Sequence, residues 1–141
     1  MKQLFSILIC FSFVSLSFAE DHSLPPLEDF VLKGNNRAYI MQRCIALYKF
    51  HIEIQDIQKE LKGEEYDNTR VTQYIKNSLA LGIYQQFFFP SDVLSDEKQS
   101  EMVAGYMRTK TKFIQHDNAI CGEVVRLVLE HIERIESKTQ Q

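Results

Sequence analysis

The sequence has few residues that interrupt helices. It contains five glycines and three prolines in 141 residues, and both are scarce after residue 35. No stretch alternates apolar and polar residues as a half-buried strand does, whereas apolar residues recur every three or four positions over long segments. The sequence therefore predicts an all-α protein. Helices that each carry one apolar stripe bury those stripes most economically against each other, so we expect a small bundle of about four helices.

Clustered positive charge is also absent. The chain carries 16 Lys and Arg against 19 Asp and Glu, and the basic residues are dispersed. Nucleic-acid binding depends on concentrated positive charge, so this composition disfavours a nucleic-acid partner. The same balance disfavours binding to anionic membrane surfaces.

Only one long apolar run is present, near residues 4–14, and it follows a single cation. The run is shorter than the about 20 residues that a membrane span needs. Ser17 and Ala19 fit the small positions that precede a cleavage site. We therefore predict a secretory signal peptide over 1–19, no membrane span in the mature chain, and a periplasmic or secreted product.

The mature chain is expected to form one domain with short flanking segments. Residues 20–35 should be an extended arm, because Pro25 and Pro26 fix their own φ and bias the preceding residue away from helix, with a short helical turn around 27–32 as the alternative for its second half. The helical domain is predicted over 36–137, followed by a frayed tail over 138–141.

Local signals mark the ends of the expected helices. Polar residues that can cap a first turn predict helix starts at Asn36, at Asp67 or Asn68, and at Ser95. Gly63 and Pro90 predict helix ends. The sequence at 116–118 predicts a break before a fourth helix, and the alternative is one continuous helix over 95–136. The stripe expected on the second helix comprises Val71, Tyr74, Ile75, Leu79, Ile83 and Phe87.

Two cysteines remain once the leader is removed, Cys44 and Cys121, and both lie within apolar stripes. An even count in an oxidising compartment predicts a disulfide between them; the alternative is two separate buried thiols. A loop of this length contributes roughly 4.5 kcal/mol in the chain-entropy model, and typical bridges contribute about 2 to 4 kcal/mol. Up-and-down order places the two cysteines at opposite poles. The bridge therefore predicts that the first and fourth helices run parallel or cross steeply.

His116 and Asp117 form the one pair that resembles a catalytic motif. The pair resembles the His-Asp motif on the active-site helix of secreted phospholipases A2. That family also has adjacent cysteines ahead of the His and a glycine-rich calcium loop, and this chain has neither. A general base also needs an orienting partner and an electrophile site, and the sequence shows no second element. We interpret the pair as an interhelical turn and assign no catalytic residue.

His51 and His131 are the candidate ligands of a metal or haem site. His51 lies seven residues after Cys44 on nearly the same helix face, and His131 lies on an apolar stripe of the fourth helix. If the disulfide holds these helices parallel, the two imidazoles could approach each other. The chain has no Cys-x-x-Cys-His or His-x-x-x-His motif, so we expect no cofactor and keep this site as the alternative.

The run Phe87-Phe88-Phe89 is the candidate binding surface. Three consecutive aromatic rings on a helix cannot all face one core, so at least one should reach a helix end, a loop or a partner. Exposed apolar patches often mark contact surfaces, and Tyr84 and Tyr106 could form the rim of this one. The leading prediction is an exported, non-enzymatic helical protein that binds an unidentified protein partner, as an adaptor, a small chaperone or an inhibitor or immunity-type protein.

Overall fold

The chain folds into five α-helices and one short 3₁₀ helix within the residues that the computed structural model describes, which are 23–33, 36–63 and 67–140. The elements are α1 (Glu28–Lys33), α2 (Arg37–Lys62), α3 (Asn68–Phe88), η1 (Pro90–Asp92), α4 (Asp96–Arg108) and α5 (Thr111–Thr139). The predicted all-α fold is confirmed. The signal peptide predicted over 1–19 lies outside the described residues.

Hydrogen bonds at the first turns of three helices confirm the predicted helix starts. The Asn36 side chain accepts a hydrogen bond from the Tyr39 amide at 3.1 Å, where α2 begins. Asp67 and Ser95 cap the first turns of α3 and α4 in the same way. Gly63 has a φ of 61° and ends α2 in the left-handed conformation that glycine adopts without strain.

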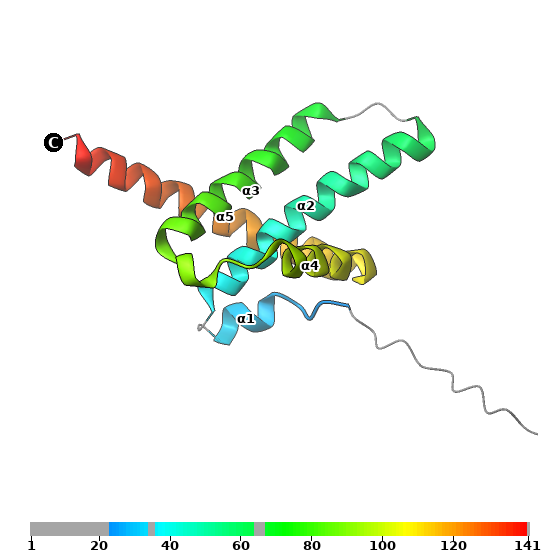
Figure 1. The fold of residues 1–141 in the computed structure, drawn as a ribbon, viewed down its shortest axis with the longest axis horizontal. Helices are drawn as coiled ribbons and strands as arrows, with labels where there is room; N and C mark the ends of the chain where they lie inside the picture. The colour runs from blue at the N-terminus through cyan, green and yellow to red at the C-terminus, as the bar shows by residue number, and fades with distance from the viewer. Residues whose placement is uncertain (1–22, 34–35, 64–66, 141) are drawn as a thin grey trace, which may run out of the picture.

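The long helices cross instead of forming an up-and-down bundle. Figure 1 shows α2 and α3 as an antiparallel pair, with α5 crossing behind them. The short α1 and the arm before it lie along the lower side of the same view. Steep crossing was one of the two arrangements that the disulfide required, and it is the one the chain adopts.

The disulfide lies where α2 and α5 cross. Cys44 and Cys121 are bonded, with their Cα atoms 5.3 Å apart, and neither side chain is exposed. The predicted bridge is therefore confirmed. The buried apolar residues that surround it come from the arm and from α2 to α5, and they include Leu27, Met41, Leu47, Leu81, Val103, Val125 and Val128.

The predicted break at 116–118 is wrong. α4 ends at Arg108 and α5 begins at Thr111, so the interruption lies at Thr109 and Lys110, and α5 continues through 116–118 without a break. Asp117 does not cap a helix, because its carboxylate is buried in an ion pair with Arg43. α5 also extends to Thr139, past the predicted end of the helical domain at 137.

The N-terminal arm fixes the position of the real break. The Thr109 hydroxyl donates to the Gly105 carbonyl at 2.9 Å and accepts a hydrogen bond from the Leu24 amide at 3.3 Å. The Leu24 side chain packs so closely on Gly105 that a Cβ atom there would lie 2.7 Å from Leu24 Cγ. Glycine at 105 therefore permits the arm to approach α4, and Leu27 of the arm is completely buried.

Candidate protein-binding surface

The most heavily buried polar groups form a closed cluster that holds the arm. Arg43 Nη2 donates to Asp117 Oδ2 at 2.8 Å, and the Tyr106 hydroxyl donates to the same oxygen at 2.7 Å. Asp117 Oδ1 accepts from the Leu27 amide at 3.1 Å, and Arg43 Nη1 donates to the Pro25 carbonyl at 2.9 Å. No buried side-chain N or O atom among the described residues is without a hydrogen-bond partner. This cluster is therefore satisfied by the chain itself.

The surroundings of the cluster shift two of its pKa values. Burial raises the pKa of Tyr106 far above its ordinary value, so its hydroxyl stays protonated and donates to Asp117. Burial by itself lowers the pKa of Arg43, but Tyr106, Tyr39 and Asp117 together hold it above its ordinary value. The guanidinium therefore stays charged while completely buried.

His116 and Asp117 do not act as a pair. Asp117 points into the buried cluster, whereas His116 is exposed and its Nδ1 lies 3.6 Å from a Glu28 carboxylate oxygen. Neighbouring residues on a helix differ by about 100° in direction, which explains why the two side chains diverge once the helix continues through them. The interhelical turn predicted here is wrong, and the Asp is a structural residue.

His51 and His131 are not brought together. His51 Nε2 lies 2.8 Å from Asn118 Oδ1, and its ring stacks on Tyr74. His131 is thirteen residues beyond Asn118 along α5, a rise of about 20 Å at 1.5 Å per residue. Among the described residues, no group of three or more His, Cys, Asp or Glu side chains is arranged to hold a metal ion.

The His51 environment gives a testable pH dependence. Burial lowers the pKa of His51, and the hydrogen bond with Asn118 only partly opposes this. The unfolded chain then binds a proton on His51 more readily than the folded chain does, so the free energy of unfolding should fall as the pH drops below about 6.5. Urea unfolding of wild type and His51→Gln over this range should give a shallower pH dependence for the variant. Parallel pH profiles would contradict this assignment.

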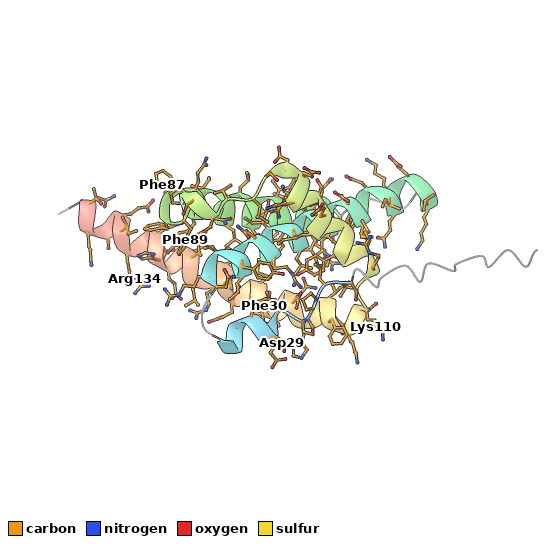
Figure 2. All side chains as sticks on the ribbon, turned by 60° about the horizontal axis from the view of Figure 1, so that its bottom comes forward. Asp29, Phe30, Phe87, Phe89, Lys110 and Arg134 are labelled. Atoms are coloured by element: carbon orange, nitrogen blue, oxygen red, sulfur yellow. A yellow bond between two sulfur atoms is a disulfide. The ribbon has the colours of Figure 1, made fainter. Side chains whose placement is uncertain are left out.

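The three consecutive phenylalanines take different environments. Phe87 is 79% exposed and Phe88 is 45% exposed, whereas Phe89 is half-buried and packs against the core. Figure 2 shows Phe87 on the upper side of the molecule at the end of α3. Tyr106, expected at the rim of this patch, is completely buried beside Arg43 and contributes nothing to the surface. The aromatic surface therefore centres on Phe87 and Phe88.

A second surface feature continues from Phe87 along the outer side of α3. Ile75, Leu79, Ile83 and Phe87 recur at intervals of four residues, and each is between 43% and 79% exposed. We call these four residues the α3 ridge. Most were expected in the core, but the side of α3 that is buried carries Val71, Leu81 and Gln85 instead. Side chains four residues apart on a helix differ by about 40° in direction, so a row with this spacing winds around the helix. This drift could have shown that the ridge turns away from the core.

Charge is nearly absent from α3. α3 carries two charged residues, Arg70 and Lys76, and the chain has no charged residue between Lys76 and Asp92. α2 and α5 pack against α3, and the residues of α3 that are buried, Val71, Leu81 and Gln85, do not belong to the ridge. The α3 ridge is therefore an uncharged apolar strip that the described part of the chain leaves partly exposed, from 43% at Ile75 to 79% at Phe87.

An aromatic cluster joins the end of the ridge to α5. The rings of Tyr84 and Phe88 lie 4.4 Å apart between centroids, and the His131 ring lies 5.3 Å from Phe88. The Tyr84 hydroxyl and His131 Nδ1 share a hydrogen bond. These contacts fix the last two turns of α3 against α5, so that Phe87 is presented from a rigid support.

One hollow of the surface lies away from the ridge. It has a volume of about 430 Å³ and is lined by the start of α2 and the segment from η1 to α4, including Tyr39, Gln42, Leu94 and Lys98. The side-chain amide of Gln42, which lines this hollow, donates to the Asp92 backbone carbonyl. The backbone carbonyl of Gln42 accepts from the side-chain amide of Gln99 at 3.2 Å. Among the described residues that line the hollow, no buried side-chain N or O atom lacks a hydrogen-bond partner that a ligand could supply.

Comparisons with protein-family models, with curated proteins and with solved structures returned no match. Within the described residues, no helix combines the length and apolar character that a membrane span requires.

Proposed function

We propose that this protein is an exported, non-enzymatic helical protein that acts by binding another protein through the α3 ridge and the adjoining Phe88. The observation that carries the proposal is the exposure of a continuous apolar strip along α3. Water-exposed apolar side chains in one row are unfavourable in isolation, and such patches on small proteins are often contact surfaces. Aromatic residues such as Phe87 are enriched at protein–protein interfaces.

Two further features support this class of function. The polar groups buried in the core are paired with one another, so they serve the fold. The Cys44–Cys121 bridge supports export to the periplasm or the medium, since disulfides persist chiefly in oxidising compartments. Adaptors, small chaperones and inhibitor or immunity-type proteins all work by this kind of contact.

Capture of partners by the immobilised mature chain tests the proposal. Phe87→Asp places a charge in the ridge, and we expect the variant to retain at least about tenfold less of each partner from the native exported fraction, because a buried unpaired charge opposes binding. Leu61→Asp is the matched control, since Leu61 at the end of α2 is also 79% exposed. Circular dichroism melting should show that both variants are folded.

The proposal fails if Phe87→Asp retains the same partners as wild type at the same level. It also fails if Leu61→Asp loses those partners equally, because the loss would then follow from added charge and not from the ridge.

A further inference from the structure

The α3 ridge has the geometry of a helix–helix contact. Its four residues lie on one row of positions spaced by four, and rows of this kind form the ridges that interdigitate in the commonest class of helix packing, at a crossing angle of about −50°. The row runs from Ile75 to Phe87, a rise of about 18 Å along the helix axis. A second helix that presents a row of the same length and spacing would match it.

The ridge is complementary to itself when turned end to end. In an antiparallel crossing centred between Leu79 and Ile83, Leu79 faces Ile83 of a second copy, and Ile75 faces Phe87 of that copy. Each of these apolar pairs then occurs twice in the dimer, once on either side of the two-fold axis. Figure 2 shows Phe87 at the upper side of the molecule, at one end of the row.

Charge favours the antiparallel arrangement. Lys76 is the single charged residue between Ile75 and Phe87, and the antiparallel crossing places it opposite Gln86 of the second copy. The two lysines then lie on opposite sides of the crossing, separated by about 15 Å along the helix direction. A parallel crossing would instead set Lys76 against Lys76. Since α3 contains no acidic residue, the antiparallel pair is the arrangement without like-charge contact.

We infer that a second copy of this chain covers the α3 ridge in the purified protein, forming a two-fold dimer through an antiparallel α3–α3 crossing. The inference rests on the proposed function, because it uses the same face and states what occupies that face before another partner binds. Burial of the ridge removes from water the apolar side chains that the single chain leaves exposed.

Light scattering coupled to size-exclusion chromatography tests the dimer on the mature chain. Wild type should elute with the mass of two chains and dissociate on dilution. Leu79→Glu and Ile83→Lys should each weaken self-association by at least about tenfold, because each buries an unpaired charge at the centre of the crossing. Both positions are more than half exposed in the single chain, so the variants should keep the helix content and melting behaviour of wild type.

Mixing the two variants is the decisive step. In the mixed dimer the carboxylate introduced at position 79 of one copy faces the ammonium introduced at position 83 of the other, so association should return to most of the wild-type level. Neither chain carries both charges, so recovery can arise only between copies in the antiparallel register. Leu61→Glu is the control and should leave self-association unchanged.

Three results would overturn the inference: a wild-type monomer at every concentration, a dimer insensitive to both substitutions, or no recovery on mixing. A monomeric wild type whose partner capture still depends on Phe87 would overturn the dimer and leave the proposed function standing. Conversely, a dimer that obeys the mixing test while Phe87→Asp retains every other partner would sustain the inference and remove the proposed function.

Discussion

Replacing Asp117 by alanine is expected to lower the free energy of unfolding by about 3 to 5 kcal/mol, the largest single effect that we predict. Asp117 is the anionic partner of Arg43, and neither side chain is more than 2% exposed. Its removal leaves a buried cation without a counter-charge, which costs far more than the loss of a surface pair. Urea unfolding followed by circular dichroism measures the change.

Two matched variants separate charge from packing. Arg43→Met combined with Asp117→Leu should be less destabilising than Asp117→Ala alone, because no unpaired charge remains in the core. Glu123→Gln is the surface control, since the side chains of Glu123 and Arg126 are each more than half exposed, and it should leave the stability essentially unchanged. An Asp117→Ala variant as stable as wild type would show that the buried pair does not form.

The arm supplies an independent readout of the same substitution. Asp117 Oδ1 accepts from the Leu27 amide, and the Arg43 guanidinium that Asp117 neutralises donates to the Pro25 carbonyl. Loss of the carboxylate should therefore increase hydrogen exchange at the Leu27 amide by more than it does at amides inside α2. Uniform acceleration throughout the chain would indicate general destabilisation without specific release of the arm.

Removal of the disulfide is the second large effect. Cys44→Ala combined with Cys121→Ala should lower the free energy of unfolding by about 2 to 4 kcal/mol, because the bridge spans 77 positions and restricts the unfolded chain. The paired substitution leaves neither Cys44 nor Cys121 as a lone thiol that could form another disulfide. Urea unfolding of oxidised wild type and the double variant gives the difference, and reduced wild type should resemble the variant.

Thiol titration of the unreduced protein in denaturant tests whether Cys44 and Cys121 are bonded to each other. For a chain that begins after the predicted signal peptide we expect no free thiol, since its two cysteines, Cys44 and Cys121, are bonded to each other. Under native conditions both sulfur atoms are buried, so a reductant should act only through opening of the chain. Two titratable thiols in unreduced material would contradict the bridge.

The sequence predicted the aromatic part of the candidate surface, but not the burial of Tyr106 or the exposure of the α3 ridge. At least one ring of Phe87-Phe88-Phe89 was predicted to leave the core, because consecutive side chains on a helix point in different directions, and Phe87 and Phe88 are the exposed ones. Tyr106 was misplaced because its burial depends on Arg43 and Asp117, residues distant from it in sequence. The outward position of Ile75 and Leu79 was missed because an apolar rhythm alone does not say which side of a helix finds a neighbour.

What the sequence determined by itself is the local structure. The starts of three long helices and the end of α2 follow from hydrogen bonds or backbone conformations that a few adjacent residues decide, as at Asn36 and Gly63. The disulfide was also predicted, on the expectation of a signal peptide over 1–19, because Cys44 and Cys121 are the two cysteines outside that segment. Tertiary structure alone decided where α4 gives way to α5, because the break depends on Leu24 docking on Thr109, 85 positions away. It likewise decided which residues of α3 face water, because α2 and α5 pack against α3 and leave the ridge partly exposed.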